Sequence, residues 1–512
     1  MTDALHRELY NSDVLANALN NGGDRPLLKR LDGPTLSVRE VRDETSRYLQ
    51  VLQGIGVGQG SRVSLIASNI PECLHVTHAL AMCGAIYVPL HPLSGLADHL
   101  SIIADAGVNV LVFEAGKFDE RAQEIAAAAP GMRLLAIGAS GAAQDIRALA
   151  AGFAPQRLVP APSGPHDVIR LGYSGGTTGK PKAIPSVERV GLLTGLYMQA
   201  VWEWPQVPNI LSCAPLTHAG GAMFMPALLR GGTFLILPKF DPVQVMEKIE
   251  AERINCMMLV PTMIYALLDH PRFGEFDLSS LETVFYGASA MNPVRLQEAI
   301  RRIGPVFAQF YGQAEAPMVL TYFRKADHDP DDLRRLASCG QPNPFIRLEL
   351  MDADMNPVPD GEPGEICVGG PLVMDGYRDA ELTAEAFKGG WLHTGDVAVR
   401  DPDGFLRIVD RTKDMIISGG FNIYPRDIED LMAEHPAVAQ VAVIGVPHDK
   451  WGEAVKAFVV LKPGMSASAQ ELAAPVAERK GSFQAPKSVE FLEAIPQTPV
   501  GKPDKKALRA RG

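Results

Sequence analysis

Cysteine is scarce in this sequence, and several features that identify other classes of protein are missing. The six cysteines are scattered and form no Cys-x-x-Cys pair, which argues against a zinc site or a disulfide framework and favours a reducing cytoplasm. No basic tract stands out, and the net charge is −11. Sequence-independent attraction to nucleic acid is therefore not expected.

Signals for export and for membrane insertion are missing too. The N-terminus, Met1 to Ala4, opens without the basic and apolar segments of a signal peptide. The longest uncharged stretches, such as Leu211 to Leu229, contain glycine, proline and histidine. We interpret them as buried core, since a membrane helix needs about 20 predominantly apolar residues. We expect a cytoplasmic protein without a membrane span, and its oligomeric state, monomer or homodimer, stays open.

The chain does contain enough apolar sequence for more than one hydrophobic core. Its 512 residues are 46% hydrophobic and 21% charged, and this length predicts two or more domains. Between Pro71 and Pro92, apolar residues at helical spacing precede an extended apolar run, which predicts a helix and then a buried strand. Similar runs recur at residues 110–113, 233–237 and 256–260. Apolar strands separated by helices predict a layered α/β fold.

A domain boundary is expected at Asp410–Asp414. These charged and polar residues stand between a strand predicted at residues 405–409 and a new apolar run that begins at Met415. We therefore divide the chain into a large N-terminal domain, residues 1–410, and a small C-terminal domain, residues 411–512.

A glycine-rich segment, residues 172–182, comes after a strand predicted at residues 168–171. Its glycines let backbone amides converge on an anion, and its hydroxyls and two lysines add donors and positive charge, as a polyphosphate requires. The segment is not a Walker A loop, because Ser174 stands where that loop has its first glycine and Pro181 follows the lysine.

The residues of this segment leave two other interpretations open. Residues 172–176 formally match the Gly-x-Ser-x-Gly elbow of a hydrolase. The elbow must lead into a helix, however, and Pro181 and Pro185 interrupt the stretch where that helix would lie. The other interpretation is a flexible surface loop without a function.

Further motifs support the phosphate-loop interpretation. The segment Ser174–Lys182 resembles the phosphate loop of the adenylate-forming superfamily, which includes acyl-CoA synthetases, adenylation domains and luciferases. Six other segments resemble motifs of that family in the expected order. They are the gate motif at 215–218, the adenine-side loop at 287–289, the central nucleotide motif at 311–315, the ribose motif at 391–396, the hinge and first segment of the mobile domain at 410–425, and the catalytic-lysine loop at 499–502.

The resemblance implies an AMP-forming acyl-CoA ligase, which joins a small carboxylic acid to AMP and then passes the acyl group to coenzyme A. It also implies a large N-terminal domain of several α/β subdomains and a small, mobile α+β domain. The residues implied in binding ATP and AMP are Ser174, Gly175, Gly176, Thr177, Thr178, Gly179, Lys180, Lys182, Gly287, Ala288, Ser289, Tyr311, Gly312, Gln313, Ala314, Asp396 and Arg411.

Charge neutralisation is the main catalytic requirement, because the first step brings a carboxylate against an anionic α-phosphate. The resemblance implies that Glu315 and the Ser174 hydroxyl hold Mg²⁺. It also implies that Lys502 places a compact positive charge between the carboxylate and the phosphate. Asp396 would accept hydrogen bonds from the two ribose hydroxyls, and Arg411 would join it on the ribose or a phosphate.

The second step needs a tunnel for the thiol of coenzyme A. The resemblance implies that His218 gates the carboxylate site and that the small domain rotates about Lys413. Gly419 and Gly420 would then face the tunnel, where absent side chains make room.

The segment after the gate predicts a pocket deeper than acetate requires. Small residues come after His218, and Gly312 stands where acetate-specific relatives carry a tryptophan. No aspartate occurs in the gate motif, which disfavours an α-amino acid, so we favour a medium-chain, branched or aryl acid. The predicted pocket residues are Ala219, Gly220, Gly221, Met223, Phe224, Phe310 and Met318.

The sequence departs from the family at three places. Ser174-Gly175-Gly176 replaces Thr-Ser-Gly, Ala314 replaces a threonine that donates to the nucleotide phosphate, and Pro503 follows the lysine. Two alternatives to an acyl-CoA ligase stay open. One is a stand-alone adenylation enzyme that loads a carrier protein, and the other is a non-catalytic nucleotide-binding relative, which Ala314 slightly favours.

Overall fold

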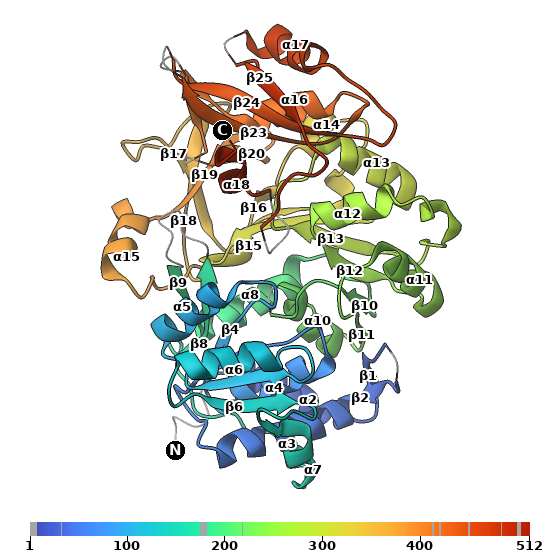
Figure 1. Ribbon diagram of the computed structural model, residues 1–512, viewed down its shortest axis with the longest axis vertical. Helices are drawn as coiled ribbons and strands as arrows, with labels where there is room; N and C mark the ends of the chain where they lie inside the picture. Colours follow the sequence, from blue (N-terminus) through green and yellow to red (C-terminus); the bar gives the residue numbers. More distant parts are fainter. Residues whose placement is uncertain are drawn as a thin grey trace.

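A computed structural model describes residues 8–31, 33–174, 182–217, 219–411, 414–418, 421–448, 451–482, 484–498 and 503–511. In this part of the chain the strands form sheets of nine, seven, four and five strands. Figure 1 shows the N-terminal α/β layers at one end of the molecule and the last sheet, with its helices, at the other. The predicted α/β fold class, with a large N-terminal part and a smaller C-terminal part, is confirmed.

The seven-stranded sheet has the order β7-β6-β5-β3-β4-β8-β9 and is parallel except for the β8–β9 pair. Its strands are β3 (Arg62–Ile66), β4 (Ile86–Pro89), β5 (Val110–Glu114), β6 (Arg133–Ile137), β7 (Gln144–Asp145), β8 (Val168–Ser174) and β9 (Lys182–Val187). The helices along this half of the chain are α2 (Asn11–Asn21), α3 (Val38–Gly54), α4 (Pro71–Met82), α5 (Leu96–Ala106), α6 (Asp119–Ala128), α7 (Ile146–Ala151) and α8 (Glu188–Val201).

Helix α4 illustrates how the sequence determines these elements. Pro71 occupies the first turn, where a missing backbone N–H costs nothing. The residues at helical spacing, Cys73, Val76 and Ala79, are buried. The chain then turns at Gly84, whose φ of +69° suits glycine, and enters β4. The predicted helix and strand between Pro71 and Pro92 are thus confirmed.

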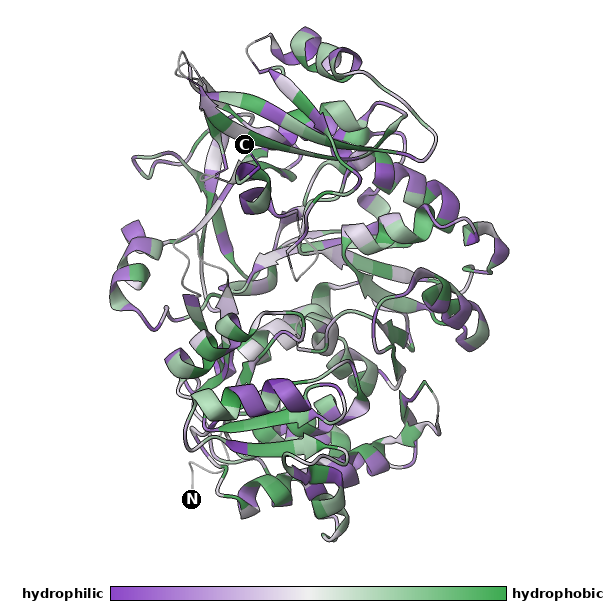
Figure 2. Cartoon of the chain, viewed as in Figure 1, coloured by the Kyte–Doolittle hydropathy of each residue, from purple (hydrophilic) through white to green (hydrophobic). Residues whose placement is uncertain are grey.

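The nine-stranded sheet has the order β16-β15-β14-β13-β12-β10-β11-β1-β2. Its strands are β1 (Pro26–Lys29), β2 (Leu36–Ser37), β10 (Asn209–Ser212), β11 (Thr233–Ile236), β12 (Cys256–Leu259), β13 (Thr283–Gly287), β14 (Phe307–Gln313), β15 (Ala316–Phe323) and β16 (Gln341–Pro342). The helices between them are α9 (Ala219–Ala222), α10 (Phe224–Leu229), α11 (Pro242–Glu252), α12 (Pro261–Leu268), α13 (Pro293–Ile303) and α14 (Leu333–Leu336). Figure 2 shows hydrophobic strands in the core and hydrophilic residues on the covering helices, such as α13.

The two remaining sheets are mostly antiparallel. The four-stranded sheet contains β17 (Arg347–Met351), β18 (Pro363–Gly369), β19 (Leu392–Arg400) and β20 (Leu406–Arg411), with α15 (Ala380–Ala386) before β19. The five-stranded sheet contains β21 (Ile416–Ser418), β22 (Phe421–Ile423), β23 (Val438–His448), β24 (Gly452–Leu461) and β25 (Ser488–Phe491), with α16 (Pro425–Ala433), α17 (Ala469–Lys480) and α18 (Lys505–Arg509).

The C-terminal sheet contacts the rest of the protein through α16. The Arg426 guanidinium donates a hydrogen bond to the carbonyl oxygen of Met291 at 2.6 Å. Arg407 of β20 pairs with Asp427 at 2.6 Å. Among the described residues, none of the helices combines the length and the apolar character needed to cross a membrane.

Candidate active site

The ribose motif lies in a bulge between β18 and β19. Glu365 pairs with Val397 and Cys367 pairs with His393, so two steps along β18 correspond to four along β19. The chain turns at Gly395, which has a φ of +71°. Bulges redirect side chains and occur often beside active sites, and this one directs Asp396 toward strand β14.

The Asp396 carboxylate is buried and receives two hydrogen bonds from β14. The Tyr311 hydroxyl donates to Oδ2 at 2.5 Å, and Gln313 Nε2 donates to the same oxygen at 2.7 Å. Burial, together with the negative charge of Asp396, raises the pKa of Tyr311 well above its usual value, so the phenol stays a donor at neutral pH. Only 4% of Asp396 is exposed. The structure thus joins the central nucleotide motif to the ribose motif.

Glu315 lies close to the end of the phosphate loop. The Tyr377 hydroxyl donates to Glu315 Oε1 at 2.7 Å, and the Lys182 ammonium lies 5.5 Å from the centre of the Tyr377 ring. Burial and the Glu315 charge raise the pKa of Tyr377, so it also stays protonated. Tyr377 was not predicted from the sequence, because a single tyrosine in a loop carries no local signal.

Close backbone approach explains several predicted glycines. A Cβ atom at Gly312 would overlap the Met318 nitrogen and lie 2.7 Å from the Ala316 carbonyl oxygen, and one at Gly287 would overlap the Phe310 carbonyl oxygen. Ala288 and Met318 have φ values of +66° and +62°, a conformation that costs roughly 1–2 kcal/mol in residues other than glycine. The β14–β15 turn and the adenine-side loop are thus tightly fixed.

The gate segment is fixed in a similar way. A Cβ atom at Gly220 would lie 2.5 Å from the Ala214 carbonyl oxygen, and a Cβ atom at Gly221 would overlap the Leu216 carbonyl oxygen. Asn69 clamps the preceding turn: its Nδ2 donates to the Ala214 carbonyl at 2.9 Å, and its Oδ1 accepts from the Leu216 N–H at 3.0 Å. Asn69 is a second neighbour of the site that the sequence did not reveal.

The predicted walls of the acid pocket pack into the main core. Met223 and Phe224 are each 1% exposed, and the Phe224 ring lies 4.7 Å from that of His78. The Phe310 ring stacks on Trp202 at 4.9 Å. Ala219 and Met318 are partly buried against the same core. These five residues stay predictions as pocket walls.

Several predicted residues cannot be placed. His218, Gly175, Gly176, Thr177, Thr178, Gly179, Lys180, Lys413, Gly419, Gly420 and Lys502 lie outside the described residues, and of Ser174 and Arg411 only the backbone is described. The Arg411 backbone pairs with Asp396, and that of Ser174 pairs with Lys182. Strand β8 therefore pairs with the antiparallel strand β9, and among the described residues the next helix, α8, begins only after β9 at Glu188. This arrangement argues against the hydrolase interpretation of residues 172–176.

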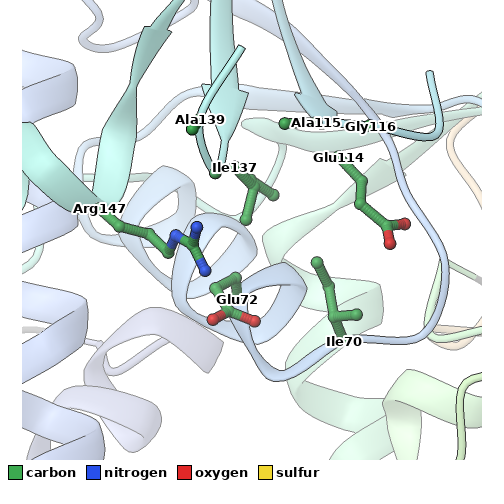
Figure 3. Close-up of a pocket in the computed structure, with 9 residues that line it drawn as sticks. Ile70, Glu72, Glu114, Ala115, Gly116, Ile137, Ala139 and Arg147 are labelled. Atoms are coloured by element: carbon green, nitrogen blue, oxygen red, sulfur yellow. The ribbon is translucent and has the colours of Figure 1, made fainter. Parts of the chain in front are cut away.

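A distinct cleft of about 340 Å³ lies at the carboxyl ends of β5 and β6. Figure 3 shows Glu72, Glu114 and Arg147 around it, with Ile70 and Ile137. None of the predicted site residues lines this cleft, and its charged groups are of mixed sign, so we assign the chemistry to the Asp396–Glu315 region instead.

Comparison with known proteins gives one consistent family. The AMP-binding enzyme family matches residues 15–378, and the AMP-binding enzyme C-terminal domain matches residues 427–502. The chain is 48% identical to the medium/long-chain-fatty-acid–CoA ligase FadD8 of Mycobacterium tuberculosis, over 99% of this chain and 91% of that protein. It is 38% identical to a feruloyl-CoA synthase of Amycolatopsis sp, over 94% and 95% of the two chains. The structure of the amide bond synthetase McbA from Marinactinospora thermotolerans is similar with a TM-score of 0.90 and 31% identity, over 97% and 99% of the chains.

Proposed function

The chain belongs to the family of AMP-binding enzymes and is an AMP-forming acyl-CoA ligase that uses ATP and coenzyme A, and we propose that its acid is a medium-chain, branched or aryl carboxylate. The observation that carries the site assignment is the buried Asp396 carboxylate, which accepts hydrogen bonds from Tyr311 and Gln313. These two residues belong to the same motif as Glu315. The names of the fatty-acid and feruloyl relatives support an acid longer than acetate.

In this proposal Asp396, Lys502 and His218 each have one task. Asp396 accepts hydrogen bonds from the ribose hydroxyls, since a carboxylate has about four acceptor positions and Tyr311 and Gln313 donate to one oxygen. Lys502 neutralises the developing charge between the acid and the α-phosphate. His218 separates the acid site from the thiol.

The oxygen atoms available at Glu315 suit a magnesium ion, which prefers hard oxygen ligands. The Glu315 carboxylate is oriented by the Tyr377 hydroxyl at 2.7 Å, and with the Ser174 hydroxyl it would hold Mg²⁺. The ion, when bound, would neutralise phosphate charge. The backbone amides of residues 175–180 and the Lys182 ammonium would bind the phosphates.

For the second step we propose a domain boundary between residues 410 and 411, with rotation about Lys413. The four-stranded sheet ends with β20 at Arg411, and the five-stranded sheet begins with β21 at Ile416. This change of sheet supports a hinge between the two strands. Gly419 and Gly420 would line the thiol tunnel after the rotation. We place the enzyme in the cytoplasm, because all six cysteines are free and buried.

Substrate preference tests the proposed acid. Burying each additional methylene stabilises a bound acid by about 0.8 kcal/mol, so hexanoate, octanoate, a branched acid and a cinnamate-type acid should exceed acetate in kcat/KM by at least about tenfold. Acid-dependent exchange of pyrophosphate into ATP measures this. Equal activity with acetate would contradict the deep pocket. Turnover that requires a carrier protein or an amine, and that coenzyme A does not support, would move the acceptor from coenzyme A to that partner.

Substitution of Glu315 tests the magnesium assignment. Glu315→Gln keeps the shape but removes the charge, so the Mg²⁺ concentration for half-maximal exchange should rise about tenfold, because hydrogen-bonded and ionic contacts of a charged group contribute about 1.5–3 kcal/mol. Tyr377→Phe, which keeps the carboxylate, should raise it less. An unchanged Mg²⁺ dependence in Glu315→Gln, with an intact melting temperature, would remove this residue from the metal site.

A further inference from the structure

The bulge at residues 394–396 is held together by side chains. The Gly395 N–H donates to Glu365 Oε1 at 2.9 Å. The Asp396 N–H donates to Thr394 Oγ1 at 3.1 Å, and that hydroxyl donates to the Ile366 carbonyl oxygen at 2.8 Å. The bulge takes these residues out of the strand register, so its shape depends on such contacts.

Glu365 connects two parts of this bulge through its two carboxylate oxygens. Its Oε1 receives the Gly395 N–H at the turn, while its Oε2 lies 2.8 Å from His393 Nδ1 on the other side of the bulge. One side chain from β18 therefore contacts both ends of the segment His393–Gly395 that precedes Asp396. We propose that Glu365 is a positioning residue of the nucleotide site, which acts through the bulge to hold the Asp396 carboxylate against the ribose hydroxyls.

The chemistry of the contacts explains why a carboxylate stands here. The Gly395 N–H needs an acceptor, and His393 Nδ1 faces the second carboxylate oxygen, so a carboxylate at position 365 offers an acceptor to each neighbour. A glutamine offers only one, because its NH₂ group donates. His393 Nε2 also faces an oxygen, the Lys388 carbonyl at 3.1 Å, so the ring is held on both sides. Hydrogen bonds to a carboxylate are about twice as strong as those between neutral groups.

The same region contains a group of possible metal ligands, Glu365, Cys367 and His393, but its geometry favours positioning. His393 Nδ1 and Glu365 Oε2 lie at hydrogen-bond distance and face each other, so each already uses the atom that a metal would need. Burial, with the nearby Glu365 charge, raises the pKa of the Cys367 thiol to about 12. Without a metal ion the thiol is therefore protonated at neutral pH.

The inference rests on the proposed role of Asp396. A comparison of ATP with an analogue that lacks one ribose hydroxyl tests the role of Glu365 separately from that of Asp396. The probes are ATP and 3′-deoxy-ATP, and the readout is the ratio of their kcat/KM values in acid-dependent pyrophosphate exchange. In the unmodified enzyme this ratio should be about ten- to a hundredfold, because the missing hydroxyl removes a hydrogen bond to a charged group. In Glu365→Ala the ratio should fall to within about threefold of unity, while the melting temperature shows a folded enzyme.

The controls distinguish positioning from general stability. Glu362→Ala removes an exposed carboxylate three residues away and should leave the ratio unchanged. Glu365→Gln, which keeps one acceptor, should give an intermediate ratio and supplies the test if the alanine variant does not fold. A Glu365 variant that loses activity equally with both nucleotides overturns the inference and leaves the role of Asp396 intact. An unmodified enzyme that does not distinguish the nucleotides overturns both.

Discussion

Alanine in place of Lys502 is expected to slow adenylate formation by about a hundred- to a thousandfold, the usual effect of removing one group that stabilises transition-state charge. Thioester formation from pre-made acyl-AMP should stay within about threefold of the unmodified rate, because that step starts from an α-phosphate already joined to the acid. The two half-reactions are measured separately, as pyrophosphate release and as thioester formed from synthetic adenylate.

Two controls accompany this variant. Lys506→Ala removes an exposed positive charge from the same C-terminal segment and should affect neither half-reaction. Lys502→Arg keeps the charge but replaces a compact ammonium with a planar guanidinium, so it should recover only part of the adenylation rate. If Lys502→Ala slowed both half-reactions by the same factor, Lys502 would be a folding or general binding residue.

Substitution of Asp396 should be nearly as severe. Asp396→Asn keeps the side-chain volume but loses the charge and replaces one acceptor with a donor. The Tyr311 hydroxyl and the Gln313 amide both point at Oδ2, so the asparagine must turn its single oxygen toward them. The ribose hydroxyls then lose a charged acceptor, and kcat/KM for ATP should fall about a hundredfold.

The effect should appear mainly as a higher KM for ATP, with the KM for the acid changed little, since Asp396 faces the nucleotide side in this proposal. Tyr311→Phe removes one donor and keeps the carboxylate, so its effect should be about tenfold or less. A normal KM for ATP in Asp396→Asn would show that the ribose hydroxyls bind elsewhere.

Some of this site was predictable because it depends on residue type and local order. Glycine-rich sequence after an apolar strand indicated a phosphate loop, and the motifs at 311–315 and 391–396 indicated Tyr311, Gln313 and Asp396. The structure brings these residues into contact although 85 positions separate Tyr311 from Asp396. The helix and strand between Pro71 and Pro92 were predictable from hydrophobic spacing and proline alone.

Other features depend on strand register and on contacts between distant segments, which hydrophobic spacing does not reveal. Glu365 meets Gly395 only because β19 has a bulge there. Asn69 and Tyr377 reach the site from loops. The sequence also does not show whether Met223 and Phe224 belong to the core or to a pocket wall, since residues of either kind are apolar and buried.

The most direct test of the ligase assignment is pyrophosphate exchange with and without coenzyme A, using the best acid. The account predicts exchange into ATP that requires the acid and proceeds without coenzyme A, because the adenylate forms first. Added coenzyme A should then give AMP and acyl-CoA in equal amounts. ATP converted to ADP, or exchange that does not depend on the acid, would contradict it.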